Sequence, residues 1–216
     1  MHAHVMNRHL SQQRAALVLD SREVSRKLWH MTPGILILGL PLVRKFEPFF
    51  SHLPAVIVGF TIVLFVLSLV HEKRFARPGE KSWAVSVWAF AATALLPLFA
   101  FPHHVEFSLT SLVILAFGDG AASLGGMALH GPALPWNERK TIAGTLSFFV
   151  CAAPCATWIY WVNSSAAVSF ESAFFCGAAA AAAAAIAESI RSSINDNLRV
   201  GAAAATVLVL MHWIAV

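Results

Sequence analysis

Apolar runs of helix length alternate with short polar segments along most of the chain. Most of these runs approach the roughly 20 residues that an α-helix needs to cross a bilayer. The expected membrane spans cover residues 28–43, 54–70, 83–101, 107–129, 141–162, 170–187 and 200–216. The first is short and contains Pro33, which makes it the least typical span. The pattern predicts an all-α fold, a polytopic membrane helical bundle of about seven transmembrane helices.

The composition supports a membrane protein that consists of one bundle. Of all residues, 58% are hydrophobic and only 12% are charged, about half the charged share of a typical soluble domain. We expect a basic tail over residues 1–27 and a single transmembrane domain over residues 28–216. The net charge of +4 is spread over loops, so the sequence indicates no nucleic-acid partner.

The distribution of basic residues predicts how the bundle lies in the membrane. Cytoplasmic loops of membrane proteins carry an excess of Lys and Arg. With a cytoplasmic N-terminus, all but Arg44 and Lys45 of the 15 Lys and Arg residues fall on the cytoplasmic side. We therefore expect the N-terminus in the cytoplasm, and the polar residues described next then lie near the same face.

Asp119 is an acidic residue inside the apolar run of the fourth span, between Gly118 and Gly120. A carboxylate at the middle of a membrane helix costs about 2.5–3.5 kcal/mol on insertion scales. It either hydrogen-bonds a neighbouring helix or belongs to a metal or substrate site. The flanking glycines favour a site, because they let another backbone or a phosphate come close.

Basic residues precede the first span. Arg26 and His30 are four residues apart in a segment that we expect to be helical, so they share a face, and Lys27 lies beside them. One interpretation is anchoring at the membrane surface together with Trp29. The other is a cationic and protic cluster that meets phosphate, and the local sequence does not decide between them.

The fifth span begins with Lys140, Thr141 and, three residues later, Gly144. Lysine is a point charge suited to phosphate. Thr141 is placed to cap the helix, whose N-terminal N–H groups attract anions. A lysine at a membrane boundary is also a common anchor, so this motif alone is weak.

Acidic and amide side chains follow the sixth span. Glu188 ends this span, and Asp196 and Asn197 lie just beyond it. Carboxylate and amide oxygens are the ligands that Mg²⁺ prefers. The alternative is that Asp196 and Asn197 only form a turn or a helix cap before the last span.

Four motifs in this order resemble the dolichol kinase and phytol kinase family, CTP-dependent kinases of lipid alcohols that are related to phosphatidate cytidylyltransferases. The motifs are Arg26-Lys27-Leu28-Trp29-His30, the segment 117–126 (FGDGAASLGG), the segment 137–148 (NERKTIAGTLSF), and Ala187-Glu188-Ser189 with the segment 195–200 (NDNLRV). Their order and spacing together carry the resemblance. They reach over most of the chain.

The resemblance implies a catalytic membrane domain with a nucleotide and Mg²⁺ site on its cytoplasmic face. The implied metal ligands are Asp119, Glu188, Asp196 and Asn197. The implied catalytic residues are Asp119, Lys140 and Asp196. The implied nucleotide and phosphate ligands are Gly118, Gly120, Arg139, Lys140, Thr141, Gly144, Arg26 and His30. The chain departs from the family at Ala143, where members often have an acidic residue.

Three functions are compatible with these residues. The first is a kinase that transfers the terminal phosphoryl group of CTP or a similar nucleotide to a lipid alcohol of the phytol, polyprenol or dolichol type. The second is a cytidylyltransferase that makes a CDP-activated lipid. The third is a small transporter with Asp119 as its ion site, although its polar groups gather at one face instead of lining a path. We expect an integral protein of the bacterial inner (plasma) membrane, with lipid and nucleotide as its partners.

Overall fold

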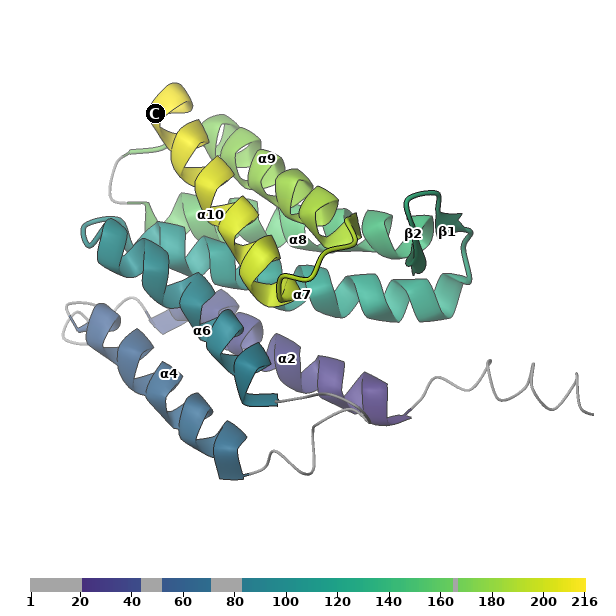
Figure 1. Cartoon of the computed structure of the whole chain (residues 1–216). Coiled ribbons are helices and arrows are strands. Elements are labelled where there is room, and N and C mark those ends of the chain that lie inside the picture. The colour runs from purple at the N-terminus through teal and green to yellow at the C-terminus, as the bar shows by residue number, and fades with distance from the viewer. Residues whose placement is uncertain (1–20, 44–51, 71–82, 165–166) are drawn as a thin grey trace, which may run out of the picture.

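The computed structural model describes residues 21–43, 52–70, 83–164 and 167–216. These residues form a bundle of seven α-helices with one short hairpin (Figure 1). The helices are α2 (Ser21–Gly39), α4 (Leu53–Val70), α6 (Trp83–Ala100), α7 (Val105–Leu129), α8 (Ile142–Asn163), α9 (Phe170–Ser189) and α10 (Asp196–Ala215). A 3-10 turn, η1 (Leu40–Val43), extends α2. The predicted all-α bundle is confirmed.

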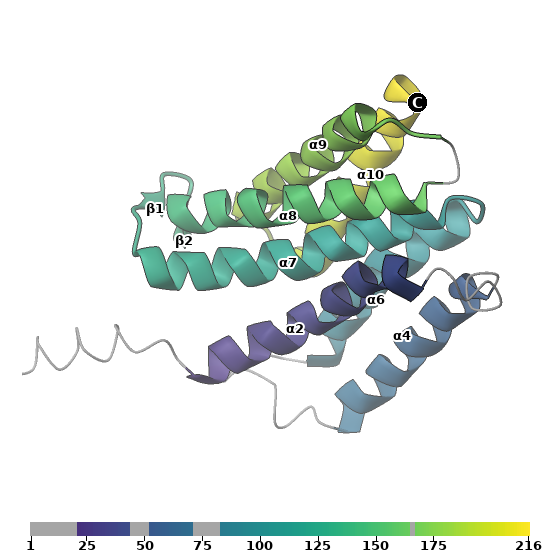
Figure 2. The same ribbon diagram turned by 180° about the vertical axis from the view of Figure 1, so that it is seen from behind.

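Helix α7 forms the centre of the bundle. It packs against α2, α6, α8, α9 and α10, and nearly all of its first 18 residues are buried. In two opposite views, α2, α4 and α6 lie on one side of the α7–α8 pair, and α9 and α10 lie on the other side (Figures 1 and 2). Polar groups on this part of α7 are therefore enclosed by the neighbouring helices.

Four helices of the described residues, α7 to α10, are long and apolar enough to cross a membrane. Shorter apolar stretches lie within α4 (Leu53–Val63) and α6 (Val85–Ala100). The seven helices match the seven predicted ranges, whereas the number that cross the membrane and the orientation of the N-terminus stay predictions. Helix α2 begins at Ser21, before the expected span at residue 28, so part of the expected tail is helical. The rest of that tail lies outside the described residues.

Two glycines let α7 and α8 approach closely. A Cβ atom on Gly118 would collide with the ring of Phe148, and one on Gly144 would lie 2.8 Å from the backbone oxygen of Ala122. Real Cβ atoms do not approach other atoms so closely, and helix backbones come close in membranes where such small residues face each other. These contacts hold the start of α8 against the middle of α7.

A hairpin between α7 and α8 was not predicted. Its strands are β1 (Ala133–Leu134) and β2 (Asn137–Thr141), paired antiparallel in the register Ala133↔Thr141 and Leu134↔Asn137. The backbone N–H of Ile142 donates to the oxygen of Pro132 at 3.0 Å, which ties the hairpin to the first turn of α8. The hairpin positions Lys140 immediately before α8.

Candidate functional site

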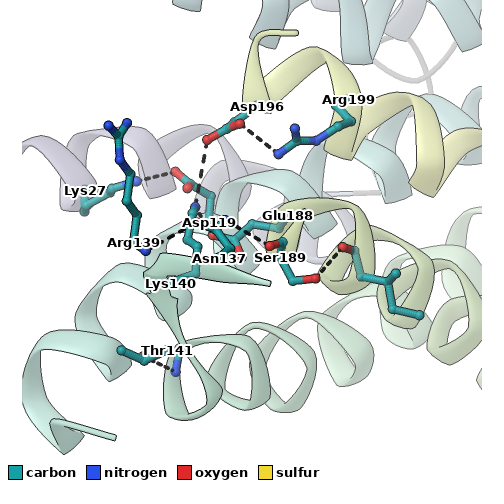
Figure 3. Close-up of polar contacts among 12 residues, drawn as sticks. Lys27, Asp119, Asn137, Arg139, Lys140, Thr141, Glu188, Ser189, Asp196 and Arg199 are labelled. Atoms are coloured by element: carbon teal, nitrogen blue, oxygen red, sulfur yellow. Dashed lines mark hydrogen bonds and ion pairs between the residues drawn. The ribbon is translucent and has the colours of Figure 1, made fainter. Parts of the chain in front are cut away.

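Asp119 forms a buried ion pair between α7 and α2. Its Oδ2 atom lies 2.6 Å from Nζ of Lys27, and the two side chains are 15% and 6% exposed (Figure 3). Nε2 of His30 lies 3.4 Å from the same oxygen, and the His30 ring also meets Phe90 of α6 edge-on. The carboxylate thus faces one cation and one imidazole, all in the core of the bundle.

Lys27 is the residue of this group that was not predicted as a site residue. Arg26 and His30 were expected to share the functional face of α2. Instead, Lys27 and His30 are the pair that points at α7. They are three residues apart, and this spacing, like a spacing of four, places two side chains on the same face of a helix. The side chain of Arg26 is half-buried.

A second cluster joins β2 to the ends of α9 and α10. The ammonium group of Lys140 donates a hydrogen bond to Oε1 of Glu188 and lies 3.8 Å from Oδ2 of Asp196. Glu188 is buried, whereas Asp196 is 53% exposed and also pairs with Arg199 at 2.9 Å. Three predicted site residues, Lys140, Glu188 and Asp196, therefore lie together, and Figure 3 shows Asp119 beside them.

Lys140 keeps its charge in this setting. Burial lowers the pKa of the ammonium group, but the hydrogen-bonded carboxylate of Glu188 outweighs that cost and raises the pKa above its ordinary value. Asp196 and Asp119 act in the same direction. Because the pKa is raised, the charge is fully present at neutral pH and is lost only in strongly alkaline solution.

The hairpin is attached to the end of α9. The side-chain amide of Asn137, a buried residue, donates to the backbone oxygen of Ser189 at 3.0 Å, and its Oδ1 accepts from the backbone N–H of Arg139 at 3.3 Å. The indole N–H of Trp136 donates to Oγ of Ser189 at 3.3 Å. Asn137 and Ser189 lie in the quoted motifs, but their position beside Lys140 and Glu188 depends on tertiary packing that local sequence does not show.

The first turn of α8 is arranged as predicted. Thr141 is the N-cap, and its Oγ1 accepts from the backbone N–H of Gly144 at 3.0 Å. The predicted cap is confirmed. Thr141, Arg139 and Lys140 precede the first turn of α8, and helix N-termini favour anions. Arg139 is exposed.

Two other predicted phosphate residues face neighbouring helices. Gly118 is packed on Phe148, as described above, and a Cβ on Gly120 would lie 2.5 Å from Met31 of α2. Both glycines are buried. The structure therefore gives them a packing role, and their contact with phosphate stays a prediction.

Asn197 holds α10 in place. Its side-chain amide donates to the backbone oxygen of Ser86 in α6, and its backbone N–H donates to Oδ1 of Asn195, the N-cap of α10, both at 3.0 Å. Asp196 and Asn197 thus lie in the first turn of α10, and the cap itself is Asn195. A role of Asn197 as a metal ligand stays a prediction.

The described carboxylates do not form a metal site by themselves. Among the described residues, no group of three or more His, Cys, Asp or Glu side chains is arranged to hold a metal ion. Each carboxylate faces a cation instead: Asp119 faces Lys27, and Glu188 faces Lys140. Mg²⁺ commonly binds through one or two carboxylates together with substrate phosphates, so a site of that kind at Asp119, Glu188 or Asp196 stays a prediction.

Comparison with known proteins points to one class of enzyme. The chain is 24% identical to probable phytol kinase 3, chloroplastic, of Glycine max over 164 residues, which cover 72% of this chain and 51% of that protein. It is 27% identical to phytol kinase 1, chloroplastic, of Arabidopsis thaliana over 137 residues, 60% of this chain and 45% of that protein. The chain is similar to plant phytol kinases.

This similarity supports the phytol kinase part of the resemblance drawn from the motifs. It does not show a relationship to dolichol kinases or cytidylyltransferases. The chain spans about half the length of the curated relatives it matches. No family model matches the chain, and no solved structure matches it.

Proposed function

We propose that this protein is an integral-membrane lipid-alcohol kinase. It transfers the terminal phosphoryl group of CTP, or of a similar nucleotide, to the primary hydroxyl of an isoprenoid or other lipid alcohol of the phytol, polyprenol or dolichol type. One observation carries the proposal: the cations Lys27 and Lys140 and the carboxylates Asp119, Glu188 and Asp196 gather at one end of an apolar helix bundle. The similarity to two phytol kinases supports the choice of a kinase.

Lys140 and the N-terminus of α8 bind the phosphates in this proposal. Glu188 holds the ammonium group of Lys140 in a hydrogen bond, so the charge is positioned before the nucleotide arrives. Thr141 occupies the cap through its contact with Gly144, and the exposed Arg139 adds charge beside it. Fixed donors aimed at phosphate stabilise the charge of the leaving diphosphate.

Mg²⁺ accompanies the nucleotide in this proposal. One or two of the carboxylates of Asp119, Glu188 and Asp196, with Asn197 beside them, would hold it together with the nucleotide phosphates. When bound, it offsets the negative charge that develops on the phosphates during transfer.

The acceptor alcohol meets Asp119 from the bilayer side. Leu28 and Trp29, next to Lys27 on α2, are 53% and 64% exposed, so this part of α2 offers the apolar tail a lipid-facing surface. The hydroxyl oxygen attacks the terminal phosphorus, the nucleoside diphosphate leaves, and a carboxylate, Asp119 or Asp196, takes the hydroxyl proton. Lys27 holds the carboxylate of Asp119 in place through their 2.6 Å contact.

The choice of membrane and the side that the site faces are also part of the proposal. The four apolar helices support an integral membrane protein. We propose the bacterial inner (plasma) membrane with the site facing the cytoplasm, as the loop charges indicate, although the two relatives are chloroplast proteins by name.

The test uses membranes that contain the full chain, Mg²⁺, nucleotides labelled in the γ-phosphate and a panel of lipid alcohols. We expect label in at least one lipid phosphate, and we expect Asp119→Asn and Lys140→Met to lower the rate by roughly a hundredfold or more. Glu171→Gln is the matched control, because Glu171 is an exposed acidic residue at the other end of α9. Absence of label with CTP, ATP, GTP and UTP would overturn the proposal.

A further inference from the structure

Trp136, between the two strands of the hairpin, is exposed and yet held in position. Its side chain is 61% exposed, while its indole N–H donates to Oγ of Ser189 at 3.3 Å. The single polar atom of the ring is thus already satisfied by the protein. The part of Trp136 that is available to a binding partner is the exposed aromatic face of its ring.

The residues that support this ring are buried and hydrogen-bonded. Leu134 and Asn137, on either side of the turn, are 4% and 6% exposed, and Asn137 donates to the backbone oxygen of Ser189. The two strands pair through Leu134 and Asn137. Binding to a ring on such a support requires little ordering, which is the main cost of binding to flexible surface side chains.

The ring also lies at a suitable place relative to the proposed phosphate site. Its hydrogen-bond partner, Ser189, directly follows Glu188, the partner of Lys140. Trp136 precedes Lys140 by four residues along an extended segment, about 13 Å at the usual rise of a strand. That length is of the order of the distance from the base to the terminal phosphate in an extended nucleoside triphosphate.

We propose that Trp136 is the base subsite of the nucleotide whose phosphates bind at Lys140. This inference rests on the proposed function and adds to it the place where the nucleoside part binds. Every nucleobase has a π-face, so stacking on an aromatic ring is tolerant of base identity. The subsite therefore accepts purine and pyrimidine nucleotides alike and contributes affinity more than choice of base.

The test measures equilibrium binding of CTP and ATP, without lipid acceptor, to the full chain in detergent micelles. Inorganic tripolyphosphate serves as a ligand that has phosphates and no base. We expect Trp136→Ala to weaken binding of both nucleotides roughly 5- to 150-fold, the range that stacking supplies. Trp136→Phe keeps most of the affinity, and tripolyphosphate binds the wild type and both variants equally.

Trp213→Ala is the matched control, because Trp213 is 65% exposed and lies near the end of α10 remote from Asp196. It leaves nucleotide binding unchanged. Unchanged nucleotide affinity in Trp136→Ala would overturn the inference and make Trp136 a membrane-surface anchor. An equal loss of tripolyphosphate affinity would also overturn it, since the residue would then organise the phosphate site. If the wild type binds no nucleotide, the proposed function fails together with the subsite.

Discussion

Removing either charge of the Lys27–Asp119 pair leaves the other charge buried without its partner. The two atoms are 2.6 Å apart, and the side chains are only 6% and 15% exposed. Breaking a buried pair by removing one partner typically costs about 3–5 kcal/mol of the free energy of unfolding. We therefore expect Lys27→Met and Asp119→Asn each to destabilise the protein by about that amount.

The double variant Lys27→Met/Asp119→Asn behaves differently. It contains no buried charge at this position, and replacing both members of a buried pair is often close to neutral. We expect it to be more stable than either single variant. In a double-mutant cycle, the changes in the free energy of unfolding of the two single variants would then add up to much more than the change in the double variant. The two variants that contain Asp119→Asn lose catalytic activity, because Asp119 meets the acceptor hydroxyl in the proposed site. Lys27→Met lowers activity, because Asp119 then lacks the contact that holds it in place.

Thermal unfolding in detergent micelles measures these differences. For a chain of this size, 1 kcal/mol corresponds to about 2–4 °C in Tm, so each single variant should lower Tm by roughly 6–20 °C. Asp196→Asn is the control, because Asp196 is 53% exposed and surface pairs contribute at most about 1 kcal/mol. Single variants that shift Tm no more than this control, or a double variant that shows the sum of both losses, would refute the reasoning.

Three further predictions concern the neighbouring contacts. Lys140→Met leaves the Glu188 carboxylate buried without its partner, so we expect it to lower the free energy of unfolding by about 3–5 kcal/mol. Adding Glu188→Gln to Lys140→Met should restore the stability, while the nucleotide affinity of this double variant stays low. Thr141→Ala removes the cap of α8 and should cost about 1 kcal/mol in thermal unfolding. Gly118→Ala places a Cβ against Phe148 and should cost about 1–3 kcal/mol by overpacking.

Each of these predictions has an outcome that contradicts it. Recovery of nucleotide affinity in the Lys140→Met/Glu188→Gln variant would mean that Lys140 does not contact phosphate. Equal stability of Thr141→Ala and Thr141→Ser would show that the hydroxyl does not contribute as a cap. The matched control for Gly118→Ala is Gly59→Ala, since a Cβ on Gly59 meets nothing within 4 Å, and equal losses at both positions would exclude overpacking as the cause.

Most of the helices were predictable because apolar runs of membrane length are a local property. The span expected at residues 83–101 is the helix Trp83–Ala100, and the cap at Thr141 depends only on the three residues after it. The hairpin Ala133–Thr141 was missed, since strands of two and five residues are too short to show a period.

The pairing of charges was less predictable than the positions of the charged residues. Asp119 stood out because a carboxylate in an apolar run needs a partner. The partner, Lys27, lies 92 positions away, and Lys140 and Glu188 are 48 positions apart. Such pairs follow from how α2 and α9 pack around α7, which no local pattern records. The same packing places Gly118 and Gly120 against neighbouring helices, a role that the local sequence did not show.

The central claim is transfer of the terminal phosphoryl group to a lipid alcohol, and a double-label reaction tests it most directly. The purified full chain receives phytol and other lipid alcohols, Mg²⁺, and CTP labelled with ³²P in the γ-phosphate and with ³H in the cytidine. The account predicts a lipid product that contains ³²P and no ³H, which disappears in Asp119→Asn. A lipid product with ³H, with the ³²P released as pyrophosphate, would contradict the account and make the protein a cytidylyltransferase.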